Sequence, residues 1–251
     1  MLAVFVLAET VAPALSSSAD RGLRWPTNFG LGLTNMILVP LAPLSGLAAA
    51  EWAQAHQFGI LNAAHMPWGL TAIATLLIRS AAGYGLHIAL HKIPMLWRVH
   101  RVHHADPHVD VSTSVRHHPL EMVVASTVLI VVATLCGLDP WALIAYELAE
   151  QLFATYSHAN VKIRSQFEKL IGAVFVTPAM HRIHHSADHR QTDSNYGTVF
   201  SFWDRLFGTW RSGTVALLGL NGICADRASA FVWLLTWPFR TRTGRGGPST
   251  R

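Results

Sequence analysis

Two short segments of nearly identical sequence carry the most distinctive chemistry in this chain. HRVHH covers residues 100–104, and HRIHH covers residues 181–185. The 15 histidines of this 251-residue chain would rarely form one H-x-x-H-H pattern by random placement, so two copies indicate a shared function. Because residues i, i+3 and i+4 lie on one face of a helix, each segment can direct three imidazole rings at one volume.

Three more histidines have positions that suit the same purpose. His87 and His91 are spaced i, i+4 at the end of an apolar run, and His158 lies where another apolar run ends. An isolated i, i+4 pair is more often a surface feature, but two triplets would be costly to cluster without a metal. Neutral imidazole binds iron, zinc, copper or nickel, and one ion accepts about six donors at most, so nine rings imply two ions. The expected ligands are His87, His91, His100, His103, His104, His158, His181, His184 and His185.

The elements that must position these histidines are apolar. The chain is 51% hydrophobic and only 13% charged, with a mean hydropathy of +0.31, which is typical of a membrane protein. Four long, weakly charged runs predict four main membrane-spanning helices in two hairpins, and therefore an all-α integral membrane fold. These runs cover residues 28–50, 68–90, 122–136 and 141–156.

The basic residues alternate with these apolar runs. The formal net charge is +5, but Lys and Arg are spread between the runs instead of forming one basic domain, so nucleic acid is not expected as a partner. The links at residues 51–67 and 137–140 contain neither Lys nor Arg. By the positive-inside rule, the polar segments 91–118 and 158–211 face the cytoplasm, where we expect them to form one histidine-rich helical cap.

The two ends of the chain predict separate features. Residues 1–15 are expected to form a short membrane helix instead of a cleaved signal peptide, because they lack a basic start and contain Glu9. Residues 1–213 are the expected membrane domain with its cap. Residues 214–251 are expected to hold an interfacial helix over residues 216–239 and a disordered basic tail. The two cysteines lack C-x-x-C spacing, so electrons must come from another protein.

Several motifs of the chain follow one another in a recognisable order. HIALH, HRVHH and HRIHH occur in succession, with RHHPLE after the second, SHAN before the third, and TDSNYG and WDRLFGTWR after it. This combination resembles the fatty acid hydroxylase and sterol desaturase superfamily of membrane di-iron enzymes. The resemblance implies a four-helix membrane domain with a cytosolic histidine-rich cap, which uses O₂ and two electrons to hydroxylate or desaturate a lipid C–H bond.

Chemistry and resemblance together define the expected cofactors and partners. Attack on an unactivated C–H bond needs a redox-active metal pair, which zinc cannot provide, so we expect two iron ions with O₂ as co-substrate. Zinc binds such ligands more tightly than iron(II) and is expected only as a substitute. The substrate is expected to be a membrane lipid of fatty acyl, sterol, carotenoid or aminolipid type. A ferredoxin or cytochrome with its reductase is expected to supply the electrons.

The nine ligands can be divided between the two ions. Adjacent histidines of one H-x-x-H-H segment diverge by about 100° around a helix, so they are expected to bind different ions, while the first and fourth residues share one. This spacing, combined with what the resemblance implies, gives two expected sets. The first is His87, His100, His103, His181 and His184, and the second is His91, His104, His158 and His185.

Other polar residues are candidates for an extra ligand or for hydrogen bonds to the ligands. His118 matches a position in the family motif RHHPLE. Glu147 and Glu150 lie in an apolar run, where a charge is costly, so one of them is expected to bond a ligating imidazole. Asp193 and Asn195 follow the last histidine segment and are expected to act in the same way.

A metal transporter or metal-storage membrane protein is the alternative function. A transporter would place acidic or histidine ligands near the middle of its spans. Residues 31–41 and 123–133, in the middles of two of the runs, contain no charge and no histidine, which favours the enzyme. We therefore expect a lipid-modifying di-iron oxidoreductase in a bacterial inner membrane, with its metal site facing the cytoplasm.

Overall fold

The computed structural model of the chain describes residues 2–15, 21–38 and 45–240. In this part of the chain the regular structure is helical, and the β-structure consists of isolated bridges, which confirms the expected all-α class. The expected basic tail begins at Arg240, and its residues 241–251 lie outside the described part. The long helices are α2 (Arg21–Leu38), α5 (Trp68–Lys92), α7 (Pro119–Cys136) and α8 (Pro140–His158).

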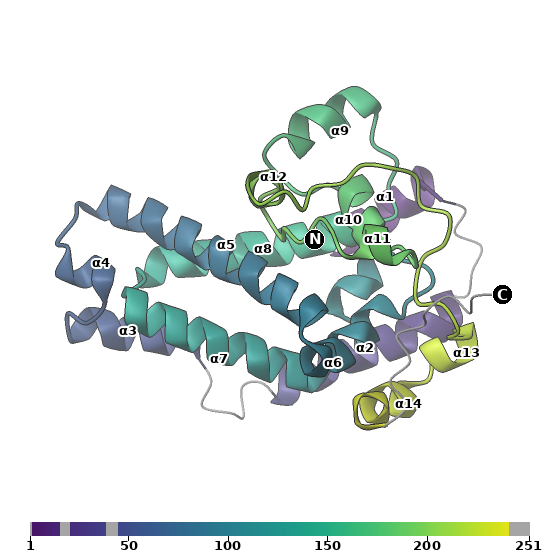
Figure 1. The fold of residues 1–251 in the computed structure, drawn as a ribbon, viewed down its shortest axis with the longest axis horizontal. Coiled ribbons are helices and arrows are strands. Elements are labelled where there is room, and N and C mark those ends of the chain that lie inside the picture. The colour runs from purple at the N-terminus through teal and green to yellow at the C-terminus, as the bar shows by residue number, and fades with distance from the viewer. Residues whose placement is uncertain (1, 16–20, 39–44, 241–251) are drawn as a thin grey trace.

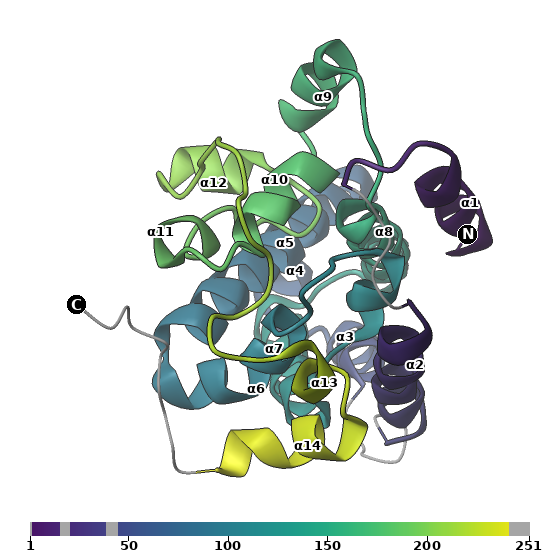
Figure 2. The ribbon, with the colours of Figure 1, turned by 90° about the vertical axis from the view of Figure 1, so that its right-hand side faces the viewer.

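Shorter helices surround these four. In Figure 1, α5, α7 and α8 run along the long axis, with α3 and α4 at one end and α10, α11, α13 and α14 at the other. Seen from this second end, α9 and α14 lie on opposite sides of the molecule (Figure 2). The short elements are α1 (Leu2–Val11), α3 (Gly46–Ala55), α4 (Ile60–Ala63), α6 (Pro94–His104), α9 (Ser165–Gly172), α10 (Pro178–His184), α11 (His189–Thr192), α12 (Phe202–Leu206), α13 (Ala225–Ala228), α14 (Phe231–Thr236) and the 3-10 helices η2 (Val111–Val115) and η3 (Trp237–Phe239).

Prolines and caps define where the long helices begin and end. Pro119 and Pro140 occupy the first turns of α7 and α8, because proline fixes a helical φ where no backbone donor is needed. The carboxylate of Asp139 caps α8 by accepting a hydrogen bond from the amide of Ala142 at 2.8 Å. Gly137 ends α7 in the left-handed conformation at φ 66°, which glycine adopts without a steric penalty. Both helices therefore cover the expected runs.

Among the described residues, the helices α5 and α7 are long and apolar enough to cross a membrane. In α8 the expected run is one helix, but it contains two glutamates. The run expected at residues 28–50 is wrong as a single helix, because α2 ends at Leu38 and α3 begins at Gly46. Ser45, the N-cap of α3, has an extended backbone (φ −114°, ψ 111°) that interrupts the run, and residues 39–44 lie outside the described part of the chain.

The helix expected over residues 216–239 is also wrong as a single helix. This segment contains the short elements α13, α14 and η3, and Gly222 before them has a φ of 82° that no helix allows. Leu234 and Trp237 are buried in one apolar cluster with Val102 of α6. The segment therefore packs directly against the helix that carries HRVHH.

A buried polar network connects α2 to the loop that follows α6. Arg24 donates hydrogen bonds to Asp106 at 2.8 Å and to Asp110 at 2.5 Å, and Asn28 donates to Asp106 at 2.9 Å. Burial acts to raise the pKa of Asp106, but the charges of Arg24 and Arg116 hold that pKa below its usual value. The network holds the C-terminal end of α6 in place, next to its three histidines.

Replacing Arg24 with alanine is expected to lower the free energy of unfolding by about 3–5 kcal/mol, because two buried carboxylates lose the cation to which both are hydrogen-bonded. Thermal or chemical unfolding of the protein in one detergent would measure the change. Arg227→Ala, at an exposed position of α13, removes the same charge and should change stability by less than about 0.5 kcal/mol. Similar losses in both variants would show that the network does not stabilise the fold.

Candidate metal centre

Four helices bring the nine histidines together. His87 and His91 come from the C-terminal end of α5 and His158 from that of α8, while α6 and α10 carry the two triplets. His185 itself follows α10 as its C-cap. All nine histidines are buried, each with at most 8% of its surface exposed. Residues separated by up to about a hundred positions in the sequence thus share one dry volume.

Short connections fix the start of each helix that carries a triplet. The single residue Ile93 separates α5 from α6, and its backbone is extended, as expected for a residue before proline. Pro94 then begins α6. In the same way Pro178 begins α10 after Thr177, whose hydroxyl accepts a hydrogen bond from the amide of Met180. The two similar histidine segments therefore lie on short helices that both begin with proline.

The nine rings form two groups of convergent nitrogen atoms. Within each group the candidate ligand atoms lie within 4.8 Å of one another. In the five-ring group, Nε2 of His104 lies 3.1 Å from Nε2 of His91 and 3.2 Å from Nε2 of His100. In the four-ring group, Nε2 of His158 lies 3.1 Å from Nε2 of His103. The five-ring group is His87, His91, His100, His104 and His184, and the four-ring group is His103, His158, His181 and His185.

This division differs from the one expected from the sequence. His103 and His104 lie in different groups, as do His184 and His185, so adjacent rings do diverge. The expected sharing by the first and fourth residues is wrong, because His100 shares a group with His104 and not with His103. Every i, i+4 pair falls in one group. Residues i and i+4 differ by about 40° around a helix and residues i and i+3 by about 60° in the opposite direction, so the fourth residue points to the other group.

Hydrogen bonds at the outer nitrogen determine the tautomer of five rings. In each of them Nδ1 faces a backbone carbonyl or a carboxylate, and these oxygens can only accept. Nδ1 therefore carries the proton, and Nε2 of the neutral ring presents a lone pair to its group. The contacts are His87 to Tyr196 O (2.7 Å), His100 to Glu121 Oε1 (2.8 Å), His103 to Arg116 O (3.3 Å), His158 to Ala154 O (2.6 Å) and His184 to Ser194 O (2.8 Å).

The inner nitrogen atoms fit a pair of metal ions. Nε2 of His103 and Nε2 of His158 lie 3.1 Å apart, and both rings carry their proton on Nδ1, so these two lone pairs repel one another unless a cation lies between them. Metal–nitrogen bonds of about 2.1 Å at right angles would place neighbouring donors about 3.0 Å apart. Nε2 of His184 is buried and has no hydrogen-bond partner among the described residues. A donor set made only of imidazole rings suits iron, zinc, copper or nickel.

Burial prepares these rings for metal binding. It lowers the pKa of His103, His104, His181, His184 and His185 well below the usual value for histidine, and neighbouring imidazoles lower each pKa further. The protonated imidazolium cannot bind a metal ion, whereas the neutral ring can. The environment therefore keeps the rings in the form that binds.

One carboxylate beside the five-ring group was missed by the sequence analysis. Glu121, which is 5% exposed, lies 2.8 Å from Nδ1 of His100 and 3.0 Å from Nδ1 of His117. Burial acts to lower the pKa of His117, but the charge of Glu121 raises it above the usual value. The ring of His117 in turn stacks on His103, with centroids 4.4 Å apart. Glu121 is the last residue of the motif RHHPLE, so the motif contained the signal.

His118 lies apart from both groups in the structure. Its Nδ1 accepts a hydrogen bond from the amide of Leu120 and caps α7, and its Nε2 lies 3.1 Å from the carbonyl oxygen of Leu235. The motif position that matched the family therefore contributes a helix cap, and its neighbour His117 is the ring that contacts the histidine groups.

Glu147 and Glu150 also have a different partner from the one expected. Arg79 of α5 donates to Glu147 at 2.7 Å and to Glu150 at 2.5 Å, and Thr198 donates to Glu150 at 2.9 Å. The two glutamates thus satisfy a cation between α5 and α8 instead of a ligating imidazole. A charge in an apolar helix needs a partner of either kind, and the sequence alone did not distinguish them.

The two residues after the last motif take different roles. Asp193 lies near the five-ring group, with Oδ1 3.5 Å from Nδ1 of His91, and it also accepts a hydrogen bond from Lys92. Asn195 instead bonds to backbone, donating to the carbonyl oxygens of Met180 and Arg211. Asp193 thus lies near His91 without a hydrogen bond to its Nδ1, which has no hydrogen-bond partner among the described residues, whereas Asn195 holds the loop that follows α10.

The fold and the two histidine groups define an all-helical protein with apolar helices long enough to span a membrane and buried sites suited to metal ions. The profile of the fatty acid hydroxylase family matches residues 72–209. This range is more than half of the chain and contains all nine histidines. The chain belongs to the fatty acid hydroxylase family.

Curated relatives are lipid-modifying enzymes by name. An alkylglycerol monooxygenase of Caenorhabditis elegans is 27% identical over 58% of this chain and 28% of its own length. An ornithine lipid hydroxylase of Rhizobium tropici is 27% identical over 71% of this chain and 53% of its own. A cholesterol 25-hydroxylase-like protein of Danio rerio is 26% identical over 66% of this chain and 61% of its own. The chain thus spans between about a quarter and three fifths of these relatives, and no solved structure matches it.

Proposed function

We propose that this protein hydroxylates a C–H bond of a membrane lipid at a pair of iron ions. The observation that carries the proposal is the convergence of nine buried imidazoles in two groups, with hydrogen bonds that turn lone pairs inward. Family membership and the names of the relatives support lipid hydroxylation as the reaction. The balanced reaction converts R–H, O₂, two electrons and two protons into R–OH and water.

Some side chains would hold the two ions, and others orient the ligands or exclude water. The five-ring group would hold one iron ion and the four-ring group the other. When bound, the pair would supply the activation of O₂, with electrons from a ferredoxin or cytochrome partner. Glu121 orients His100 through the Nδ1 proton of that ring. Burial of all nine rings excludes water from the volume around them.

We extend the proposal to the arrangement in the membrane. The apolar α5 and α7 would span the bilayer together with α2 and α8, which gives four spans in two hairpins. The residue ranges 91–118 and 158–211 would form the cap on the cytoplasmic side of a bacterial inner membrane. Residues 1–213 would be the enzymatic domain, and residues 214–251 would lie at the interface.

Lipid extracts provide the test of this function. Cells that express the protein with a reductase partner are compared by mass spectrometry with cells that express a His104→Ala variant. The proposed function predicts a lipid that gains one oxygen only with the unaltered protein, which should also hold close to two iron ions per chain. A product that has lost two hydrogens would indicate desaturation instead. Bound metal without any altered lipid would support the alternative, a metal-binding or metal-transporting membrane protein.

Replacing Glu121 with glutamine is expected to weaken iron binding about 10- to 100-fold, because His100 loses the carboxylate that orients it. Competition with a coloured iron chelator, monitored by absorbance, would measure the affinity. Glu51→Gln, at an exposed position well before His87, the first of the nine candidate ligands in the sequence, is the matched control and should leave the affinity unchanged. Equal affinity in both variants would remove Glu121 from the metal centre.

A further inference from the structure

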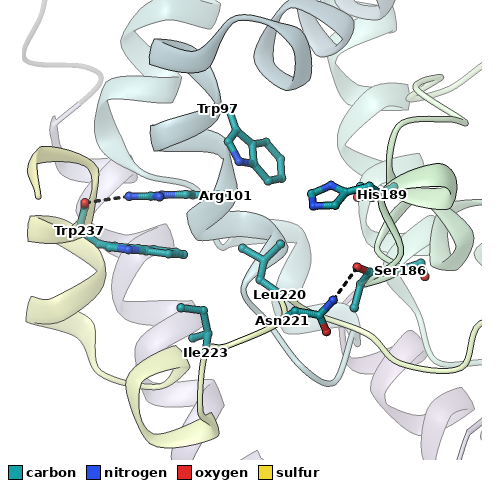
Figure 3. Close-up of a pocket in the computed structure, with 10 residues that line it drawn as sticks. Trp97, Arg101, Ser186, His189, Leu220, Asn221, Ile223 and Trp237 are labelled. Carbon is teal, nitrogen blue, oxygen red and sulfur yellow. Dashed lines mark hydrogen bonds between the residues drawn. The ribbon is translucent and has the colours of Figure 1, made fainter. Parts of the chain in front are cut away.

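A pocket lies beside the histidine groups and contains none of their nine rings. Figure 3 shows Trp97 and Arg101 of α6 on one side of it, and its other walls come from residues 186–192 and 220–223 and from η3. The indole ring of Trp97 also faces the five-ring group, with its centroid 5.1 Å from that of His91. The pocket and the five-ring group therefore share one aromatic side chain as a wall.

The segments on either side of the pocket are also fixed to the four-ring group. Residues 186–192 begin directly after His185, and the amide of Gly219 donates to the carbonyl oxygen of His185 at 3.3 Å. The side chain of Asn221 donates to the carbonyl oxygen of Ala187 at 3.2 Å. A molecule in this pocket would thus lie against segments that position both groups.

Arg101 is a buried cation that lines this pocket without a carboxylate partner among the described residues. It is 4% exposed, and its guanidinium carbon lies 4.0 Å from the centroid of Trp237. One nitrogen donates to the carbonyl oxygen of Trp237 at 3.1 Å, while Nε is buried and has no partner in the described part of the chain. The charged neighbour that acts on it is Arg98, another cation. A buried guanidinium with an unused donor favours an anion.

The remaining walls combine polar and apolar side chains. Asn221 and His189 are polar, and Leu220 and Ile223 lie beside them (Figure 3). The adjoining elements α14 and η3 expose large apolar residues, with Val232 71% and Phe239 66% exposed. Such exposed apolar side chains beside apolar helices fit contact with lipid. One buried cation next to this surface fits an amphiphile better than a free ion.

We propose that this pocket binds the anionic headgroup, a phosphate or a carboxylate, of the lipid that the protein oxidises. The proposal rests on the proposed function, since it names the substrate class of that same enzyme. Arg101 binds the negative charge, and Trp97 separates the headgroup from the five-ring group. Lipids with a neutral headgroup leave Arg101 without a counter-charge and bind less well.

Calorimetric titration of the purified full-length protein in a neutral detergent tests the proposal without any turnover. Dodecyl phosphate is the anionic probe. Dodecanol, which has the same alkyl chain without a charge, is the uncharged probe, and inorganic phosphate is the free anion. Arg101→Gln is expected to weaken dodecyl phosphate binding at least about tenfold, whereas Arg101→Lys keeps part of it. Arg98→Gln removes the same charge from α6 at a position that does not line the pocket and should have no effect.

The outcomes separate this proposal from the proposed function. Metal content and helical circular dichroism of each variant are measured alongside, so that a misfolded Arg101→Gln variant is recognised. In that case the binding of dodecyl phosphate by Arg101→Lys is compared with that by Arg98→Gln, and only Arg101→Lys should bind it more weakly. Equal binding of dodecyl phosphate and dodecanol, or equal weakening in Arg98→Gln and Arg101→Gln, would overturn the proposal. Inorganic phosphate that binds as tightly as dodecyl phosphate would overturn the lipid part. Because no reaction is measured, a failure of lipid hydroxylation would leave the binding result unchanged.

Discussion

Metal-free protein is expected to lose stability steeply as the pH falls below about 6.5, the pKa of histidine in an unfolded chain. Burial lowers the pKa of five ring-bearing residues outside the apolar helices well below this value in the folded state. Between the two pKa values the unfolded chain binds protons that the folded chain does not. Stability therefore rises with pH, is fully present above about 6.5, and falls by up to about 1.4 kcal/mol per pH unit for each ring below it.

Chemical unfolding of chelator-treated protein in detergent, at a series of pH values between about 8 and 5, would measure this slope. In the same metal-free background, His184→Gln should reduce the slope by about 1.4 kcal/mol per pH unit, because one buried titrating ring is gone. His56→Gln is the control, since His56 is exposed. A metal-free protein whose stability does not change across this range would show that the rings are not buried as neutral groups.

The positions of the long helices could be predicted where an apolar run and a strong start signal coincide. The apolar runs at residues 122–136 and 141–156 follow Pro119 and Pro140 closely, and in the structure α7 and α8 begin at these two prolines. The prediction of one helix over residues 28–50 was wrong because mean hydropathy does not register a capping residue such as Ser45, whose hydroxyl accepts a hydrogen bond from the amide of Ala48 at the start of α3. Hydropathy measures affinity for lipid, whereas helix continuity depends on backbone hydrogen bonds.

The identity of the nine histidines could be predicted because their spacing is local, but their partners could not. Glu121 reaches His100 only because the start of α7 packs against α6, and the sequence offers no distance between those helices. Arg101 was part of HRVHH from the start, yet its lack of a carboxylate partner is a property of tertiary packing. The division of the rings into groups had the same limit. A ring three or four residues along a helix is rotated by about 60° or 40°, and either ring can share a group with the first until the positions of the neighbouring helices are known.

Removing two histidines from one group is expected to have a different result from removing one from each, and this tests the five-and-four division of the structure against the division expected from the sequence. His158 and His181 both belong to the four-ring group, so the double variant His158→Ala/His181→Ala should lose one ion and keep close to one iron per chain. Under the division by first and fourth residues, these two rings would serve different ions, and both ions would be weakened. The double variant His104→Ala/His158→Ala removes one ring from each group, so both ions should be weakened. Under the division by first and fourth residues, the same two rings would serve one ion, and the other ion would be kept.

Iron per folded chain, measured after gel filtration, is the readout, and hydroxylation of lipid is the second one. Both double variants are expected to lose activity more than about 100-fold, beyond the 10- to 100-fold range of changes in residues that only orient ligands, because the reaction uses both ions. His118→Ala removes a ring that caps α7 instead of facing either group, so it should keep both ions at a cost of about 1 kcal/mol in stability. If His158→Ala/His181→Ala retained no iron while His104→Ala/His158→Ala retained one ion, the five-and-four division would be wrong, because each ion can be lost separately only when its own ligands are removed.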